Sequence, residues 1–421
     1  MSEVGKAVTG RTVVDVSIIM PCLNEAGCLP ACIANAREAL DMMRTSYGLS
    51  GEIVIADNGS TDGSPAIAEA LGARCIHVTR RGYGAALAGG ATAAYGRYLV
   101  MGDADGSYDF RDAVAMVGKL MHGADLCMGS RFKGRIEPGA MPWKNRYIGN
   151  PVLTGILNIL FRAGISDAHC GIRALTRGCF DRLQLSGDGM EFASEMVIKA
   201  ALLGCTIAEV PATLSRDLRD RPPHLRPWRD GWRHLRYLLM LSPTWLFAAP
   251  AALFAGLALG ILALAGIGAL HGSSSYVGNY WIILAGGLLT VAHSALLLAA
   301  AGNLYGVREG YRRRSDHSMV FARWVSLEVM LIAGAVCVMA GGSILAGVLG
   351  YWSAQRFMPL LNVLPAVLGT SLLVIGAQNI LGGFLIAIVN GNDADFVRPA
   401  PTPASSVPAS RASSLVSTEV A

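Results

Sequence analysis

The chain has 421 residues, 52% hydrophobic and only 15% charged, and its mean hydropathy of +0.43 is too high for an ordinary soluble protein. The formal net charge of +5 is small, and positive residues gather before the first long apolar segment, which favours contact with a membrane surface over nucleic-acid binding. The nine cysteines are scattered without a CxxC pair, a pattern that indicates reduced thiols rather than disulfides or a zinc site.

Strands and helices alternate in the first half of the chain. Residues 1–14 lack the apolar segment of a signal peptide, and we expect them to be disordered. Short β-branched runs predict strands at 16–20, 52–56, 75–79, 98–102 and 126–130, and helical periodicity predicts helices at 29–44, 64–72, 85–96 and 110–121. This alternation predicts an α/β domain over 15–226, with a mainly parallel sheet covered by helices.

Polar motifs follow four of these strands. They are PCLNE after the first strand, DNGSTDG after the second, DADGS after the fourth and SRFKG after the fifth. Open α/β sheets bind ligands at the carboxyl ends of their strands, so we expect the motifs to lie at the binding edge of the domain.

Asp103 and Asp105 leave the fourth strand with only Ala104 between them. Alternate residues of an extended chain point the same way, so both carboxylates face one side. Because two nearby anions repel each other, we expect a positive group between or beside them, and a divalent cation is the favoured one. Mg²⁺ often takes one or two carboxylates and completes its shell with water and phosphates, so a diphosphate-bearing substrate fits this arrangement.

The segment after the fifth strand is basic. We expect it to form a loop that carries Arg131, Lys133, Arg135, Lys144 and Arg146. Several cations beside a binding edge predict a phosphate cradle. The alternative is a solvated basic loop.

Residues 227–241 form the junction with the apolar half of the chain. At helical spacing the apolar side chains share one face and the arginines lie off it: Trp228, Trp232, Leu235 and Leu239 against Arg229, Arg233 and Arg236. This pattern is typical of an amphipathic helix at a membrane interface. A core-packed helix with solvated arginines is the alternative.

Four apolar segments follow, at 245–270, 280–302, 329–352 and 358–390, each longer than the about 20 residues that span a bilayer. Gln378 and Asn379 predict a tilt or break in the fourth. Arginines concentrate in the loop between the second and third segments, at 308, 312–314 and 323. The positive-inside rule then predicts a multi-pass protein of the inner (plasma) membrane, with this loop, both termini and the α/β domain in the cytoplasm. Residues 391–421, rich in Pro, Ser and Ala, are expected to be disordered.

Seven motifs together resemble the successive signatures of family 2 inverting glycosyltransferases, which have the GT-A fold. They are VSIIMPCLNEAGCLP, VIADNGSTDGS, RGYGAALAGG, VMGDADGSYD, MGSRF, DAHCGIRAL and EVPATL. Within that family they are similar to the dolichyl- and polyprenyl-phosphate sugar synthases. The resemblance covers about residues 14–240; a four-span C-terminal region belongs to some members only.

The resemblance implies a donor site for a nucleotide sugar. Residues along the base and ribose would be Pro21, Leu23, Asn24, Glu25 and Asp57. Asp103, with Ala104 beside it, would face the ribose and diphosphate, and Asp105 together with Asp103 would bind Mg²⁺ or Mn²⁺. Leu23 stands where Tyr is common, and Ser107 where some relatives carry Gln as a second metal ligand.

The resemblance also implies that Arg131 holds phosphate and acts in catalysis with the two aspartates, and the basic segment after the fifth strand adds Lys144 and Arg146 as expected acceptor-binding residues. Transfer to a sugar hydroxyl needs a general base, whereas a lipid monophosphate is already largely a dianion at neutral pH. The expected reaction is transfer of a sugar, UDP-glucose being the favoured donor, to polyprenyl or dolichyl monophosphate, with inversion. Its product would be a donor for envelope glycan or glycoconjugate assembly.

Other functions stay open. A processive polysaccharide synthase usually carries QxxRW, but the one Arg-Trp pair here, Arg323-Trp324, has Val320 at the Gln position. An enzyme that glycosylates a hydroxyl of a polysaccharide or lipid would need a base among Asp167, Glu191 and Glu195. A regulator or transport-coupled membrane module is a third reading. The sequence identifies neither the sugar nor the lipid length, and it leaves the oligomeric state open, a homo-oligomer included.

Overall fold

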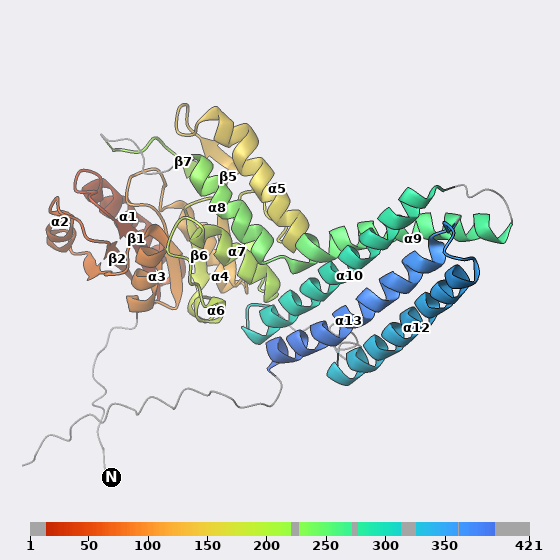
Figure 1. Cartoon of the computed structure of the whole chain (residues 1–421). Coiled ribbons are helices and arrows are strands. Elements are labelled where there is room, and N and C mark those ends of the chain that lie inside the picture. Colours follow the sequence, from red (N-terminus) through yellow and green to blue (C-terminus); the bar gives the residue numbers. More distant parts are fainter. Residues whose placement is uncertain (1–13, 220–226, 272–276, 313–325, 361, 392–421) are drawn as a thin grey trace, which may run out of the picture.

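The computed structural model describes residues 14–219, 227–271, 277–312, 326–360 and 362–391, with side chains of the junction helix described from 231 onward. The segments expected to be disordered, 1–14 and 391–421, lie outside the described residues except for their innermost residue. So do Arg313, Arg314 and Arg323 of the arginine-rich loop. Figure 1 shows an α/β domain followed by a group of long helices that lie side by side.

A seven-stranded sheet forms the centre of the α/β domain, with the order β3-β2-β1-β4-β6-β5-β7. Only β6 runs antiparallel to its neighbours β4 and β5, so the prediction of a mainly parallel sheet is confirmed. The strands are β1 (Val16–Cys22), β2 (Gly51–Asp57), β3 (Arg74–His77), β4 (Tyr98–Met101), β5 (Leu126–Ile136), β6 (Arg173–Thr176) and β7 (Ile207–Leu214). The last two were not predicted.

Strand β5 runs on to Ile136 instead of ending at Ser130, so the expected loop position of Arg131, Lys133 and Arg135 is wrong. The strand continues because it pairs with β7 past an irregularity between Ser130 and Arg135. Polar residues can lie in a strand because its hydrogen bonds to the neighbouring strand are made by backbone N–H and C=O groups and do not depend on the side chains.

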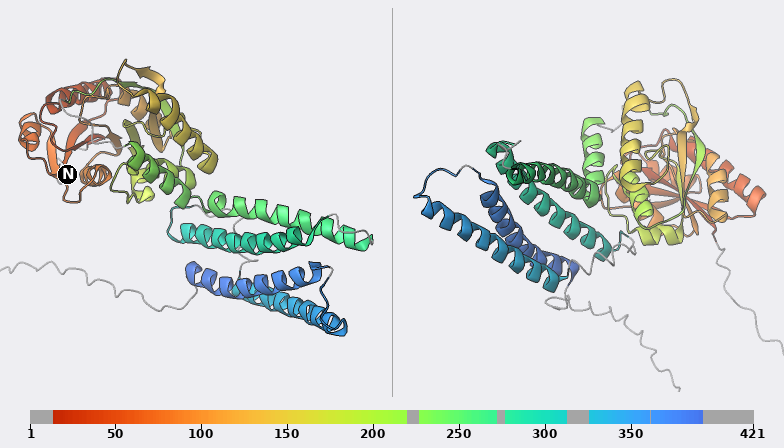
Figure 2. Two further views of the ribbon diagram at one scale, coloured as in Figure 1. Left: turned by 45° about the horizontal axis from the view of Figure 1, so that its top comes forward. Right: turned by 90° about the vertical axis from the view of Figure 1, so that its right-hand side faces the viewer.

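Helices cover both faces of the sheet (Figures 1 and 2). One core joins α1 and α4 to alternate residues of β1 such as Ile18 and Met20, and a second core joins α3, α5 and α7 to Ile19 between them. This alternation is what a strand buried on both faces requires. The helices are α1 (Leu29–Tyr47), α2 (Ser64–Ala70), α3 (Tyr83–Ala93), α4 (Asp112–Met121), α5 (Asn150–Phe161), α6 (Arg177–Leu183), α7 (Phe192–Leu202) and α8 (Pro227–Met240).

Helix α3 ends at Ala93, earlier than its Ala/Gly-rich sequence predicts. Ala94 is extended, and Gly96 packs so closely on β1 that a Cβ there would lie 2.6 Å from the backbone nitrogen of Ser17. Close approach of two backbones therefore stops the helix.

Among the residues that the structure describes, four helices are long and apolar enough to cross a membrane, which confirms the four predicted spans. They are Thr244–Leu270, α10 (Asn279–Arg308), α12 (Leu327–Ala354) and α13 (Leu364–Asn390). The first of them consists of a π-helical turn, η2 (Thr244–Ala248), followed by α9 (Ala249–Leu270). The fourth begins at Leu364 rather than 358, with Pro365 in its first turn, where its missing N–H does no harm.

The predicted break at Gln378 and Asn379 is absent from α13, which is continuous there. Both amides bond to His293 of α10, through Nδ1 at 2.8 Å and Nε2 at 3.2 Å, and Gln378 also donates to Ser294 at 2.8 Å. Polar groups at membrane depth are costly unless they are paired. Because these are paired side chain to side chain, the helix keeps its own backbone hydrogen bonds.

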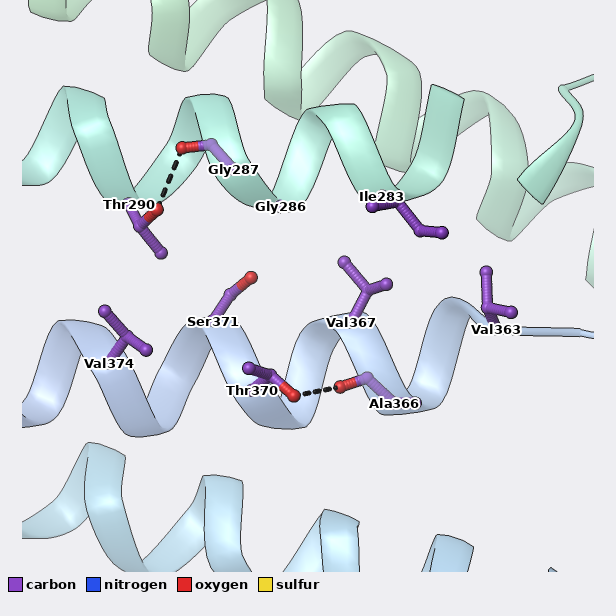
Figure 3. Close-up of a pocket in the computed structure, with 10 residues that line it drawn as sticks. All are labelled: Ile283, Gly286, Gly287, Thr290, Val363, Ala366, Val367, Thr370, Ser371 and Val374. Carbon is purple, nitrogen blue, oxygen red and sulfur yellow. Dashed lines mark hydrogen bonds between the residues drawn. The ribbon is translucent and has the colours of Figure 1, made fainter. Parts of the chain in front are cut away.

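Helices α10 and α13 also line a cavity of about 440 Å³ (Figure 3). Apolar side chains such as Ile283 and Val367 dominate it, and the hydroxyls of Thr290 and Thr370 donate to carbonyls of their own helices at 2.8 Å. Elsewhere the bundle packs through glycines: a Cβ on Gly341 of α12 would lie 2.6 Å from the carbonyl oxygen of Gly369 on α13. Small residues at helix contacts are typical of membrane bundles.

Candidate active site

The loops after β1 and β2 are tied together at the carboxyl edge of the sheet. The backbone N–H of Asn24, a residue with a φ of +59°, donates to the Ser60 hydroxyl at 2.9 Å, and the Thr61 N–H donates to Asn24 Oδ1 at 2.7 Å. Asp62 Oδ2 accepts from the N–H of Ala26 at 2.9 Å. The polar motifs PCLNE and DNGSTDG therefore form one structural unit.

Asp57 ends β2 and is buried, 4% exposed. Its carboxylate accepts the N–H groups of Gly59 and Ser60, each at 3.0 Å, and contacts His77 Nδ1 at 3.3 Å. Burial acts to raise the pKa of Asp57, but these hydrogen bonds outweigh it and leave the pKa below its usual range. The side chain is thus ionised, and it shapes the loop after β2, to which the predicted donor-binding residue Asn24 is hydrogen-bonded.

Asp103 and Asp105 lie beside one another on the loop after β4, and different groups hold them. Asp103 Oδ1 accepts from the Tyr83 hydroxyl at 2.8 Å, and Asp105 Oδ1 accepts from the N–H and hydroxyl of Ser107 at 3.0 and 2.5 Å. Burial, and then the negative charge of Asp105, raise the pKa of Asp103 to about 6. The pair is therefore electrostatically strained as two anions, as the sequence predicts.

The positive group beside the pair is Arg219, which sequence reasoning missed. Its Nη1 lies 3.0 Å from Asp105 Oδ2, and its Nε donates to both Glu25 oxygens at 2.9 and 3.1 Å. The guanidinium therefore joins the loop after β1 to the loop after β4. The run of arginines after EVPATL was the available signal, but nothing local shows which of them turns toward the sheet.

The donor set fits a cation that finishes its shell with substrate. Among the described residues, no group of three or more His, Cys, Asp or Glu is arranged to hold a metal ion, which argues against a closed structural site in that part of the chain. Two adjacent carboxylates whose negative charges repel each other suit Mg²⁺ or Mn²⁺, which neutralises them and takes its other ligands from phosphates and water. Asp105 and Asp103 would hold it.

Arg131, expected to bind phosphate, is buried in an ion pair with Asp167. Its Nε lies 2.7 Å from Asp167 Oδ2 and its Nη2 lies 2.8 Å from Oδ1. Lys133 likewise contacts Glu209 at 2.6 Å. These contacts give both cations a structural partner, so a phosphate contact by Arg131 would have to be shared with Asp167.

Lys144 and Arg146 lie apart from that pair, at the π-helical turn η1 (Asn145–Gly149) that precedes α5. Each cation lies over a neighbouring aromatic ring, Lys144 5.9 Å from the centroid of Trp143 and Arg146 5.5 Å from that of Tyr147. The two rings are exposed, as are Ile148, Val152 and Ile159 along η1 and α5. Exposed apolar groups with basic neighbours are typical of a membrane-contacting surface.

Helix α8 lies beside α5 and α7 and has a buried side and an exposed side (Figure 1). The buried side carries His234 and Leu238, while Trp232 and Met240 are exposed. On the face expected to lie at the membrane interface, Trp232 is exposed while Leu235 and Leu239 are half-buried, and the packed side is the one on which His234 bonds to Ser194 of α7 at 2.8 Å. The side chains of Trp228 and Arg229 lie outside the described residues.

The candidate bases for a hydroxyl acceptor differ in their surroundings. Asp167 is held by Arg131, and Glu195 by Lys199 at 2.8 Å and by the N–H groups of Ser186 and Gly187. Burial acts to raise the pKa of Glu195, but Lys199 outweighs it and leaves the pKa lowered. Within the described residues, Glu191 Oε2 is buried without a hydrogen-bond partner.

Comparison with known proteins assigns both halves of the chain. Residues 17–184 match Glycosyl transferase family 2, and residues 300–390 match the Glycosyltransferase family 2 C-terminal transmembrane region. The low-salt glycan biosynthesis hexosyltransferase Agl6 of Haloferax volcanii is 37% identical over 385 residues, which cover 88% of each chain.

Two further relatives align with about half of this chain. The dolichyl-phosphate hexose transferase of Haloferax volcanii is 29% identical over 48% of this chain and 84% of its own. The polyprenol monophosphomannose synthase of Mycolicibacterium smegmatis is 30% identical over 47% of this chain and 76% of its own. The extent of the match to the first relative, together with the sheet and the four apolar helices, shows that this chain is a membrane glycosyltransferase that belongs to glycosyltransferase family 2.

Proposed function

We propose that the enzyme transfers a hexose from a nucleotide diphosphate sugar, UDP-glucose being the favoured donor, to a polyprenyl or dolichyl monophosphate. The observation that carries this proposal is the Asp103–Asp105 pair at the carboxyl edge of the sheet, in a domain joined to four membrane-length helices. It supports a diphosphate donor bound with a cation on one side and a lipid acceptor on the other. Relatives named for dolichyl-phosphate and polyprenol-monophosphate chemistry support the same acceptor class.

The reaction follows from the charges at the site. An oxygen of the lipid phosphate dianion forms a bond to the anomeric carbon, the bond from that carbon to the diphosphate breaks, and the configuration inverts. Mg²⁺ or Mn²⁺ on Asp105 and Asp103 would neutralise the departing nucleoside diphosphate. The phosphate carries no proton that must be removed. The commitment of Asp167 and Glu195 to ion pairs agrees with a reaction that uses no general base.

The acceptor would approach along the membrane-contacting side of the domain. Lys144 and Arg146 lie among the exposed rings of Trp143 and Tyr147, which supports a position at headgroup depth. Arg131 would orient the phosphate from its place beside Asp167.

We further propose that the α/β domain faces the cytoplasm from the inner membrane. Arg308 at the end of α10 donates to the Val389 carbonyl at 3.0 Å, which places an arginine at the end of the bundle where α10 and α13 both finish. A cysteine introduced at Gln355, in the opposite turn, should react with an impermeant thiol reagent on intact cells, and one at Glu309 should not. The reverse labelling would invert this topology.

An acceptor competition tests the chemistry. The purified full chain in detergent is offered polyprenyl phosphate, a polyprenyl diphosphate-linked sugar and a free oligosaccharide in parallel, with several UDP- and GDP-sugars, and the products are analysed by mass spectrometry. We expect one sugar joined to the lipid through one phosphate, and no product from Asp105→Asn. Exclusive glycosylation of the hydroxyl-bearing acceptors would contradict the proposal.

A hydroxyl acceptor is the second candidate, and a single observation favours it. Glu191 has the buried oxygen without a partner described above, whereas the carboxylates of Asp167 and Glu195 are held in ion pairs, and a general base needs an oxygen that is not already engaged. If hydroxyl-bearing acceptors alone react, Glu191→Gln should abolish the reaction while the protein stays folded.

A further inference from the structure

Arg219 reaches the cation site from a short strap, defined here as residues 215–219 after β7. The strap lies on the loop that carries the aspartates, because the Ser215 N–H donates to the Ser107 carbonyl at 2.9 Å and the Leu218 N–H to the Asp105 carbonyl at 2.8 Å. Leu218 covers Gly106, whose φ is +80°, so closely that a Cβ there would lie 2.7 Å from Leu218 Cδ1. The backbone of the strap thus aims Arg219 at the site.

Two carboxylates contact this one guanidinium, and a third lies near it. Glu25 receives two of its nitrogens, Nε at 2.9 Å and Nη2 at 2.9 Å from Oε1, and Asp105 receives Nη1 at 3.0 Å. Asp103 is not in contact with it, but the charge of Arg219 acts to lower the pKa of that carboxyl. Arginine and the three acids leave an excess of negative charge, which a divalent cation would neutralise.

Both oxygens of Asp105 are already engaged, Oδ1 by hydrogen bonds from Ser107 and Oδ2 by the ion pair with Arg219. A metal ion on Asp105 would therefore lie against the guanidinium, and two cations at that distance repel. The side chain of Arg219 is 18% exposed, twice the 9% of Asp105, so it has a route out of the contact. Its fork of donors matches a phosphate as well as a carboxylate.

Resting on the proposed metal-dependent function, we propose that Arg219 is a built-in counter-cation that a divalent metal must displace from Asp105. Free metal then competes with a resident positive charge and binds weakly. A nucleoside diphosphate supplies new anionic oxygens for the displaced guanidinium, so nucleotide and metal bind cooperatively. Arg219 is thus a positioning residue that makes the metal arrive with the donor rather than before it.

Mn²⁺ binding to the full chain in detergent tests this, measured by calorimetry or by the free-ion EPR signal, with Mn²⁺ alone and with UDP or GDP present. Arg219→Gln should bind Mn²⁺ alone about tenfold more tightly than the wild type, since its competitor is gone. The gain in Mn²⁺ affinity produced by the nucleotide should shrink by a similar factor. Arg216→Gln is the matched control: Arg216 lies on the same strap, is exposed, donates to the Pro138 carbonyl at 2.7 Å, and should bind Mn²⁺ as the wild type does.

Thermal unfolding separates this role from a merely structural one. Arg219→Gln leaves Glu25 and Asp105 without their cation, so its melting temperature should be lower than that of the wild type. Mn²⁺ alone should then raise the melting temperature of the variant by more than it raises that of the wild type. Arg219→Lys, which keeps the charge, should give intermediate values and serves if the glutamine variant does not fold.

If Arg219→Gln binds Mn²⁺ alone no more tightly than the wild type does, but binds Mn²⁺ plus nucleotide normally, the counter-cation role is wrong. The proposed function would then remain intact. If no variant and no wild-type sample binds Mn²⁺ under any condition, with Asp105→Asn as the blank, the metal part of the proposed function fails together with this inference.

Discussion

The hydroxyl of Tyr83 donates a 2.8 Å hydrogen bond to Oδ1 of Asp103 and so joins the first turn of α3 to the end of β4. The glycines on either side of Tyr83 make this contact possible. Gly82 has a φ of +137°, and the Gly84 N–H donates to the Asp188 carbonyl at 2.8 Å. A Cβ at either glycine would collide with the backbone carbonyls of residues 187–188, so this contact requires glycine at both positions. The motif RGYG thus positions a hydrogen-bond donor behind the aspartate pair.

We expect Tyr83→Phe to weaken donor binding. Loss of the hydroxyl removes a hydrogen bond that favours ionised Asp103, so the pKa of Asp103 should rise above about 6 and the carboxylate should bind the metal–nucleotide complex less well near neutral pH. A hydrogen bond to a charged group contributes about 1.5–3 kcal/mol, so affinity for UDP with Mn²⁺ should fall about tenfold or more. Calorimetry measures this. Tyr95→Phe, at the far end of α3 and exposed, is the control; equal affinities for the two variants would contradict the expected role.

The Arg131–Asp167 ion pair should stabilise the folded state only as a pair. Asp167→Ala leaves a buried guanidinium uncompensated, which typically costs about 3–5 kcal/mol, so the melting temperature should drop markedly. The double variant Arg131→Met with Asp167→Leu should recover much of the loss because no buried charge remains. Thermal unfolding of the single and double variants checks this, and a double variant no more stable than Asp167→Ala would contradict it.

Arg146 should matter for the acceptor and not for stability. It lies on the exposed turn before α5, over Tyr147, so Arg146→Ala should leave the melting temperature nearly unchanged. Loss of a charge-assisted contact to phosphate should lower kcat/KM for polyprenyl phosphate about ten- to a hundredfold, with little effect on donor KM. Arg162→Ala, exposed at the opposite end of α5, is the control. If the variant instead raises the KM for the donor and leaves kcat/KM for polyprenyl phosphate unchanged, Arg146 contacts the donor and not the acceptor.

Stability should fall in mild acid because of His169. The imidazoles of His169 and His234 meet edge to face, with ring centroids 5.0 Å apart, and the Ser194 hydroxyl bridges them at 3.4 and 2.8 Å. Burial first, and then the charges of His234, Arg131 and Arg173, lower the pKa of His169 well below its usual range. The folded state therefore keeps this imidazole neutral, whereas the unfolded chain takes up a proton as pH falls through about 6.5.

The stabilisation is thus present above about pH 6.5 and is lost as pH falls below it. The melting temperature of the wild type should drop between about pH 7.5 and 5.5, and His169→Gln should drop less over the same interval. His122→Gln, at an exposed position beyond α4, should behave as the wild type does. Parallel curves for His169→Gln and the wild type would contradict this account.

Sequence alone determined the features that depend on neighbouring residues. The five predicted strands, the helices between them and the four spans follow from hydrophobic periodicity and length, and the structure contains all of them. The spacing of two residues also predicts that the charges of Asp103 and Asp105 interact, although the structure has a turn at Ala104 and Asp105 rather than an extended chain. The predicted boundaries were less accurate. Helix α3 stops early where Gly96 packs on the backbone of β1, and α13 starts late, with Pro365 in its first turn.

Only the tertiary structure decided which charges meet. Arg219 contacts Glu25 across 194 residues and Arg131 contacts Asp167 across 36, and no local pattern selects these partners from the many charged residues in between. The antiparallel β6, inserted between β4 and β5, brings Gly171 so close to Asp103 that a Cβ there would lie 2.7 Å from Oδ2. Such contacts depend on the order of the strands in the whole sheet. An arginine has a long side chain and can form an ion pair with any carboxylate that the fold brings within reach.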